Sequence, residues 1–384
     1  MLNRKSRNNI NIKRQRNGTI LSSPDKGIMV TVTFLLVIGG MAIFSASSAK
    51  AISLGLSPTY FILRQFAYTI AGVFCLIWLS NYDYKQLSKH SITFAWVVVG
   101  LLLLIYIPGI GVNTNEASRW LALGPVQFQP SELAKPAVIL LLANAFSQDA
   151  KIFVQEKMKY YLPIMVMIIC IYKQPNLSML LLLFGSGTVM YFCACMDWKK
   201  LATVISVAIL AIVSTMHGYQ KTRLTTWLDP MADQLGKVYN IIQSLIAFSS
   251  SGFFGVGYGN SIQKLGWLPE CHTDFIYAII AEEMGFITCI LIIGLFWTLI
   301  QRGIIISSRC PDIFGKLVAI GIAFSIGIQA FINMGVTCGL LPATGVPLPF
   351  ISYGGTSIIV SLSMIGILLN ISKKRIKKIS RYDN

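Results

Sequence analysis

Long apolar runs separated by short basic stretches constrain this chain more than any other feature of its sequence. Hydrophobic residues make up 54% of its 384 residues and charged residues only 12%, whereas roughly 25% of a soluble domain is charged. A helix needs about 20 consecutive apolar residues to cross a bilayer. The composition therefore excludes a water-soluble globular enzyme and predicts an all-α integral membrane protein.

Applying that length to the sequence predicts ten spanning helices. The first run is too long for the core of a typical signal peptide, so we interpret it as a spanning helix, with a cleaved leader as the alternative. The boundary between the fifth and sixth spans, at Gln174-Pro175, is the least defined. The ten spans cover 27–48, 59–79, 91–108, 131–147, 160–172, 176–195, 201–216, 275–300, 314–337 and 354–371.

The charges predict the orientation of these helices. Of the 32 Lys and Arg residues, 23 lie in the basic tails at 1–26 and 372–384 and in the loops on the same side. The positive-inside rule places both tails in the cytoplasm. The net charge of +17 thus reflects membrane topology, and we expect no nucleic-acid partner. The membrane domain, 27–371, then has its outward loops at 109–130, 217–274 and 338–353.

The large loop 217–274 contains an amphipathic stretch at 238–250 that is too short to cross the membrane. Such a segment is typical of a helix that lies on the interface or dips into it. We therefore expect ten spanning helices and, in this outward loop, one short amphipathic helix.

Glu132 and Lys135 are ionisable residues at membrane depth, where charges are costly and often functional. They follow Pro130 and Ser131, which can open a helix, and their spacing of three places them on one helix face. The pattern predicts an ion pair. It either lets this helix pack or forms the charged wall of an outward-opening cavity.

A glycine-rich segment lies in the large outward loop. Gly255, Gly257 and Gly259 alternate along the chain, and such a loop can let backbone N–H groups approach a phosphate. As a dinucleotide signature it fails, because no βαβ unit surrounds it. We therefore expect no organic cofactor.

Asp274 ends the run 268–274 and stands at the mouth of the eighth predicted span. A carboxylate beside low-dielectric surroundings is a candidate general base, because burial and nearby cations tune its pKa. The alternative is structural, with Thr273 or Asp274 as the N-cap of a helix that starts at Phe275.

Glu282 and Glu283 lie two to three turns further into the membrane than Asp274. At least one of them should face protein or water, and we expect pairing with Lys135 or Arg64.

The third outward loop continues into an irregular stretch at 341–355 that is rich in proline and glycine at membrane depth. Irregular backbone is tolerated there only where it is buried in protein or lines a cavity. We therefore predict that it forms the wall of a lipid-accessible pocket.

In combination, these motifs resemble the SEDS family of bacterial cell-wall proteins, named for shape, elongation, division and sporulation. The resemblance extends from about Asp25 to Leu369, and its division branch is more similar than its elongation branch. The chain departs from the family pattern at Asn176, Cys271 and Tyr277. The matching motifs are Ser118-Arg119-Trp120, Phe128 to Lys135, Asp229-Pro230, Gln243-Ser244, Gly255 to Lys264, Leu268 to Ile276, Glu282-Glu283-x-Gly285, and Gly339 to Gly355.

The resemblance implies a ten-helix peptidoglycan glycosyltransferase that polymerises lipid II, a disaccharide-pentapeptide on undecaprenyl pyrophosphate. It implies a class B penicillin-binding protein and other division membrane proteins as partners. It also implies the bacterial inner membrane as location, or a plastid membrane if the gene is plastid-encoded. Asp274 is then the catalytic residue, Glu132 and Lys135 are also needed, and a divalent cation such as Mg²⁺ is expected near Asp274.

Three functional hypotheses remain open from the sequence. In a transferase, Asp274 takes a proton from the attacking sugar hydroxyl, and Arg119 and Lys264 stabilise the leaving pyrophosphate. A lipid II flippase would use Glu132 and Lys135 as parts of a gated path, and a non-catalytic scaffold would use the tails to recruit a synthase. The further residues expected to contact substrate or line the cavity are Gln263, His272, Ser352 and Tyr353.

Overall fold

The computed structural model describes four long stretches, 23–107, 126–148, 154–195 and 239–376, and several short ones between and beside them. The predicted span 201–216, most of 217–238 and the outer parts of both tails lie outside the described residues. The long helices are α2 (Lys26–Ser53), α3 (Tyr60–Asn81), α4 (Tyr84–Leu104), α5 (Pro130–Ser147), α6 (Val154–Lys173), α7 (Leu177–Cys195), α11 (Ile276–Arg309), α12 (Ile313–Thr337) and α13 (Gly355–Lys373).

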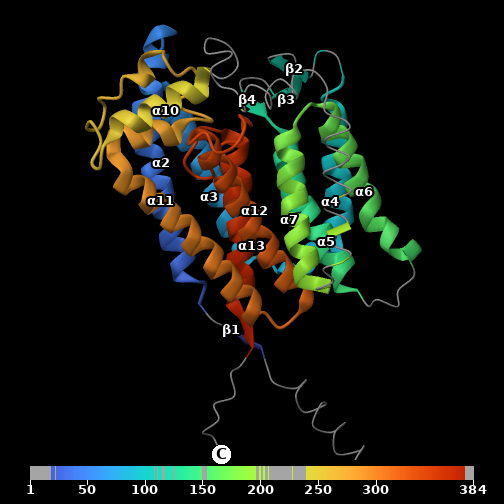
Figure 1. Ribbon diagram of the computed structural model, residues 1–384. Coiled ribbons are helices and arrows are strands. Elements are labelled where there is room, and N and C mark those ends of the chain that lie inside the picture. Colours follow the sequence, from blue (N-terminus) through green and yellow to red (C-terminus); the bar gives the residue numbers. More distant parts are fainter. Residues whose placement is uncertain are drawn as a thin grey trace, which may run out of the picture.

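Each of these nine helices overlaps one of the predicted spans, although α4 and α6 begin six or seven residues earlier than predicted and α11 ends nine residues later. Seven of them are long and apolar enough to cross a membrane, and the chain is a multi-pass membrane protein. The doubtful boundary is confirmed, because α6 ends at Lys173 and α7 begins at Leu177. The amphipathic stretch forms α10 (Tyr239–Ser251), which lies across one end of the bundle (Figure 1).

Two small sheets add to the helical bundle. The loop 109–130 contains β2 (Gly111–Thr114), β3 (Ala117–Leu123) and β4 (Val126–Phe128), which pair antiparallel in that order. Sequence analysis assigned no strands there. At the other end of the bundle, β1 (Thr19–Leu21) pairs antiparallel with β5 (Lys374–Ile376), so both termini leave the bundle on one side (Figure 1).

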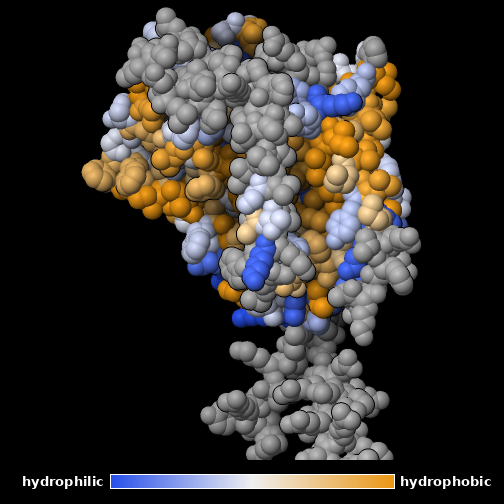
Figure 2. All heavy atoms as spheres, turned by 45° about the vertical axis from the view of Figure 1, so that its right-hand side comes forward, coloured by the Kyte–Doolittle hydropathy of each residue, from blue (hydrophilic) through white to orange (hydrophobic). Residues whose placement is uncertain are grey.

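The helix α13 lies in the middle of the bundle and packs along α3 (Figure 1). Glycines let the two backbones come close: a Cβ at Gly366 would lie 2.6 Å from the carbonyl oxygen of Leu76. Small residues at helix contacts are typical of membrane bundles, where close backbone packing drives association. The helix surfaces at the periphery of the bundle are largely hydrophobic, as expected for contact with lipid (Figure 2).

The helix α11 is interrupted at Gly285, where φ is 80° and ψ is 178°. The turn at 252–257 packs against this interruption and forms hydrogen bonds with its free backbone groups. Four N–H groups donate: Val256 to the oxygen of Glu282 (2.8 Å), Gly257 to that of Glu283 (3.1 Å), Phe286 to that of Gly252 (3.2 Å) and Ile287 to that of Phe253 (3.3 Å). The N–H groups of Val256 and Gly257 in the glycine-rich loop are therefore engaged with protein and are not presented to a phosphate.

The contact between the turn and α11 leaves no room for a side chain at Gly255. A Cβ there would lie 2.3 Å from the carbonyl oxygen of Glu283, whereas one at Gly259 would meet nothing within 4 Å. Both glycines have positive φ, 80° and 87°, so alanine is strained by about 1–2 kcal/mol at either position. We predict that Gly255→Ala destabilises the protein by at least about 2 kcal/mol more than Gly259→Ala, because only the first adds a collision. Thermal unfolding in detergent measures both, and equal losses would contradict the packing.

Candidate active site at the end of the bundle opposite the termini

Asp274 lies in the turn that leads into α11, at the end of the bundle opposite the termini. The helix begins at Ile276, its N-cap residue is Phe275, and no side chain caps it. The expectation that Thr273 or Asp274 caps this helix is therefore wrong, because the chain turns one residue later than expected. The Asp274 carboxylate is partly exposed, and its Oδ2 lies 3.4 Å from where a Cβ on Gly345 would stand.

The irregular loop 338–353 holds the turn that carries Asp274. Ser352 Oγ donates to the carbonyl oxygen of Thr273 (2.6 Å) and accepts the N–H of Leu348 (2.8 Å). The N–H of Tyr353 donates to the carbonyl oxygen of His272 (3.0 Å). Ser352 and Tyr353, expected from the sequence to line the cavity, thus fix the backbone of the turn.

Two buried amides on α12 hold the same loop. Gln329 Nε2 donates to the carbonyl oxygen of Pro347 (2.9 Å), and one turn later Asn333 Nδ2 donates to those of Val346 and Asp274 (both 2.7 Å). Each amide is 1% exposed. Sequence analysis named neither residue, although two amides four positions apart in an apolar span are the signal that marks functional polar groups in membranes.

The predicted ion pair between Glu132 and Lys135 is confirmed. It lies in the first turns of α5, with Lys135 Nζ 2.6 Å from Glu132 Oε2 and the two side chains 0% and 2% exposed. Lys135 Nζ also donates to Gln329 Oε1 (2.7 Å). The pair is therefore connected through Gln329 to the loop beside Asp274.

His272 is buried between two aromatic rings. Its ring centroid lies 5.3 Å from that of Phe61 and 5.8 Å from that of Tyr353. Burial, with a contribution from nearby Lys50, lowers the pKa of His272 to about 4, because desolvation disfavours the charged form. The imidazole is therefore neutral at pH 7, and its Nδ1 has no hydrogen-bond partner among the described residues.

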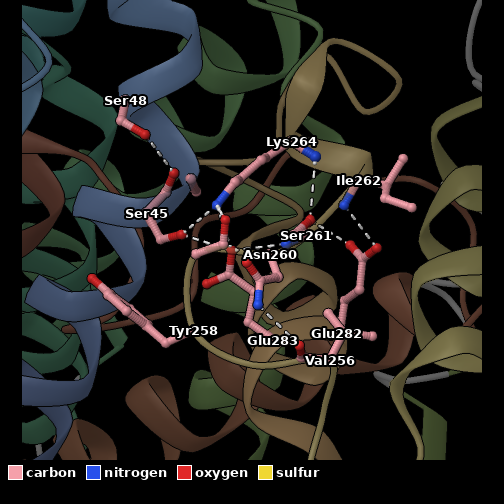
Figure 3. Close-up of polar contacts among 12 residues, drawn as sticks. Ser45, Ser48, Val256, Tyr258, Asn260, Ser261, Ile262, Lys264, Glu282 and Glu283 are labelled. Carbon is pink, nitrogen blue, oxygen red and sulfur yellow. Dashed lines mark hydrogen bonds and ion pairs between the residues drawn. The ribbon is translucent and has the colours of Figure 1, made fainter.

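Lys264 belongs to a second polar cluster, at the interruption of α11 (Figure 3). Its Nζ donates to Glu283 Oε1 (2.8 Å), Ser45 Oγ (2.9 Å) and the carbonyl oxygen of Gly259 (2.6 Å). An ammonium group has three N–H donors, so all of them are used inside the protein. Lys264 is thereby a structural residue of this cluster and has no donor left for a pyrophosphate.

The expected pairing of Glu282 and Glu283 with Lys135 or Arg64 is corrected by this cluster. Glu283 pairs with Lys264, and Glu282 accepts hydrogen bonds from the Ser261 hydroxyl and from the N–H of Ile262 (Figure 3). The glycine-rich turn reverses the chain and brings 259–264 back over α11. The acids are therefore satisfied by the loop that precedes their own helix.

Gln263 and Arg119 were also predicted for the site from the sequence. Gln263 is 7% exposed in the short 3₁₀ helix η2 (Gln263–Leu265), beside Lys264. Arg119, on β3, donates to the carbonyl oxygens of Gln174 (3.1 Å) and Pro175 (2.7 Å), at the junction of α6 and α7. The structure thus connects the turn of Asp274, which includes His272, to Ser352 and Tyr353, and through Gln329 and the facing loop to Lys135 and Glu132. Lys264 belongs to the second cluster, and Gln263 is its neighbour in the chain.

The donor set around Asp274 limits the kind of metal site that it can form. Within the described part of the chain, no group of three or more His, Cys, Asp or Glu residues is placed to hold a metal ion. Mg²⁺, however, is usually held by one or two carboxylates together with substrate phosphates. Asp274 fits that second kind of site, in which the substrate supplies the other ligands.

These features define a multi-pass membrane protein with a carboxylate site built on irregular backbone at one end of its bundle. Residues 26–377 match the family model FTSW_RODA_SPOVE, described as cell cycle protein. The chain belongs to this FtsW, RodA and SpoVE family, which confirms the resemblance found in the sequence.

Several proteins of this family are similar over almost their whole length. A probable peptidoglycan glycosyltransferase FtsW from Geobacter sp. (strain M18) is 37% identical over 358 residues, covering 91% of this chain and 97% of the relative. Stage V sporulation protein E from Bacillus subtilis (strain 168) is 36% identical over 361 residues, covering 92% and 98%.

Solved structures share the fold. A chain from work described as structural coordination of polymerization and crosslinking by a peptidoglycan synthase complex superposes with a TM-score of 0.75. It is 28% identical, over 91% of this chain and 97% of that one. The rod shape determining protein RodA from Thermus thermophilus gives a TM-score of 0.68 at 26% identity, over 92% and 98%.

Removing one partner of the Glu132–Lys135 pair should be strongly destabilising. Lys135→Met leaves Glu132 buried and unpaired, which should cost about 3–5 kcal/mol, and exchanging the two charges should recover part of it. The pair between Lys374 and Asp83 is 25% and 41% exposed, so Lys374→Met serves as a control that should cost about 1 kcal/mol or less. Thermal unfolding of the purified variants measures the losses. A second readout is enzymatic activity. If the variant with exchanged charges unfolds at the normal temperature but is as inactive as Lys135→Met, the two residues contact substrate directly.

Proposed function

We propose that this protein is a peptidoglycan glycosyltransferase that polymerises lipid II at the outer face of the membrane during cell division. The observation that carries the proposal is the placement of Asp274. Asp274 is partly exposed, its side chain does not cap α11, and it stands on a turn whose backbone is fixed by Ser352, Tyr353 and Asn333. A carboxylate held in this way is suited to accept a proton from a bound substrate.

In the proposed reaction, the 4-hydroxyl of the acceptor sugar attacks C1 of the donor sugar. The bond between C1 and the pyrophosphate oxygen breaks, undecaprenyl pyrophosphate leaves, and the hydroxyl proton passes to Asp274. A positioned base of this kind contributes about a hundredfold to ten-thousandfold to the rate. The irregular loop beside Asp274 forms one wall of the site, and neutral His272 packs behind the turn.

Charge on the departing pyrophosphate requires a cation. A divalent ion such as Mg²⁺, bound by Asp274 and the pyrophosphate oxygens, would neutralise that charge. Lys264 is unsuited to this role because Glu283, Ser45 and Gly259 use its three donors. Arg119 remains a candidate on the protein side, held at the junction of α6 and α7.

The comparisons support the choice of activity and of cellular role. Relatives at 36–38% identity are named probable peptidoglycan glycosyltransferase FtsW, which favours division over elongation, and catalysis over lipid II flipping or scaffolding. The match to a chain of a peptidoglycan synthase complex supports a class B penicillin-binding protein as partner. We further propose the bacterial inner membrane as location, with other division proteins as neighbours.

The proposed orientation places both tails in the cytoplasm and Asp274 outside. It is supported by the pairing of β1 with β5 at the end of the bundle that lies away from Asp274 (Figure 1). In intact cells, a cysteine introduced at Phe254, which is 81% exposed, should react with a membrane-impermeant thiol reagent. A cysteine at Lys85 on the other side should react only after permeabilisation. The reverse labelling pattern would contradict the orientation.

Replacing Asp274 tests the base directly. Asp274→Asn keeps the shape of the side chain but cannot accept the proton, so polymerisation of labelled lipid II should fall by at least about a hundredfold. The purified protein with its co-expressed partner is assayed with Mg²⁺ and with EDTA; full activity in EDTA would contradict the metal role. Asp83→Asn, at the N-cap of α4, is a matched control that should retain activity. Near-normal glycan synthesis by Asp274→Asn would refute the assignment.

A further inference from the structure

Asn333 connects the turn of Asp274 to the wall that faces it. A single nitrogen, Nδ2, donates one hydrogen bond to the carbonyl oxygen of Asp274 and another to that of Val346, each 2.7 Å long. The side chain is 1% exposed, so water does not compete for its two N–H donors. Through this one atom, the side chain donates to both the 272–275 turn and the 338–353 loop.

The orientation of this amide is determined by its surroundings. If the amide were rotated, Oδ1 would face two carbonyl oxygens and both hydrogen bonds would be lost. Oδ1 has no hydrogen-bond partner among the described residues, so it makes no described contact that compensates. A buried amide that leaves its acceptor unsatisfied while using both donors is positioned by the contacts that it donates.

These two contacts set the distance between the Asp274 carboxylate and Gly345. Gly345 precedes Val346, has a φ of 71°, and stands beside Asp274 Oδ2. Gln329 already anchors the loop through Pro347. Asn333 also donates to Asp274, which lies outside this loop. Anchoring of the loop alone does not explain that second hydrogen bond.

We propose that Asn333 is a positioning residue for Asp274. It holds the backbone of the catalytic turn and the facing loop at a fixed separation, so that the carboxylate meets the acceptor hydroxyl in a productive geometry. This inference rests on the proposed role of Asp274 as the base. It assigns to Asn333 an effect on turnover and none on the binding of lipid II.

The test compares Asn333→Ser with Asn144→Ser. Asn144 is also a buried asparagine that donates two hydrogen bonds, to the carbonyl oxygen of Ser88 (3.0 Å) and to Ser91 Oγ (2.7 Å). It lies on α5, about 20 Å along the helix from Pro130, toward the end where the termini leave. Serine in a helix can donate back to the carbonyl four residues earlier, so both variants keep a satisfied side chain.

Each variant is purified with its co-expressed partner, and thermal stability, kcat and KM for lipid II polymerisation are measured. We expect similar losses of stability, unchanged kcat for Asn144→Ser, and a fall in kcat of at least about tenfold for Asn333→Ser with KM within about threefold. Small misplacements of reacting groups have effects of this size. A kcat for Asn333→Ser within about twofold of the control, or a raised KM with normal kcat, would overturn the proposal.

Asn333→Asp provides a second measurement, which applies even if Asn333→Ser folds poorly. It has the same shape, but its ionised carboxylate donates nothing, whereas its protonated form donates one O–H group. The ratio of its kcat to that of the unmodified protein should therefore rise as the pH is lowered. A ratio that does not change with pH would count against the proposal, because a purely structural defect does not depend on this proton.

The result for Asp274→Asn separates this inference from the proposed function. If Asp274→Asn is inactive and Asn333→Ser is fully active, the base assignment stands and only the positioning role fails. If Asp274→Asn is active, the base assignment fails, and the positioning role fails with it.

Discussion

Backbone groups that leave regular structure inside an apolar bundle must find their hydrogen bonds within the protein. Water is absent at that depth, and each unpaired N–H or C=O group raises the free energy of the folded protein by roughly several kcal/mol. In the described part of the chain, two departures from helical structure stand out, at Gly285 in α11 and along the loop 338–353. Both departures lie toward the end of the bundle that carries Asp274, and the polar residues there are arranged around them.

The two departures are satisfied in different ways, with different consequences for chemistry. At Gly285, the turn 252–257 supplies backbone partners, and the acids beside it accept from Lys264 and from residues of the same loop. The charged groups of that cluster form their hydrogen bonds with one another and with neighbouring protein groups. Along 338–353, by contrast, side chains of α12 and Ser352 hold the backbone carbonyls. The same contacts fix the turn that carries Asp274, whose side chain does not cap α11, and we therefore assign the chemistry to Asp274.

Much of this architecture could be predicted from the sequence, because it follows from local patterns. Runs of apolar residues predict the helices, and the spacing of three between Glu132 and Lys135 predicts their contact on one helix face. The pairing of Lys264 with Glu283 was missed because it joins residues 19 positions apart through a chain reversal at the glycine-rich turn. The strands in the loop 109–130 were missed as well, since hydropathy gives helix lengths but not how outward loops pair. Asn333 carried a signal, a polar residue in an apolar span, without a partner visible in the sequence.

The buried ion pair is best understood through the amide that it contacts. Burial of Glu132 and Lys135 carries a desolvation cost that their attraction only partly offsets, so the pair alone is weak evidence for stability. Lys135, however, donates to Gln329 Oε1, which leaves Gln329 Nε2 to face the carbonyl oxygen of Pro347. The charge thus fixes the orientation of an amide that could otherwise rotate. Val346 precedes Pro347, and Asn333 binds the carbonyl oxygens of both Val346 and Asp274. The pair on α5 and the backbone of Asp274 are therefore connected through two consecutive carbonyls of one loop.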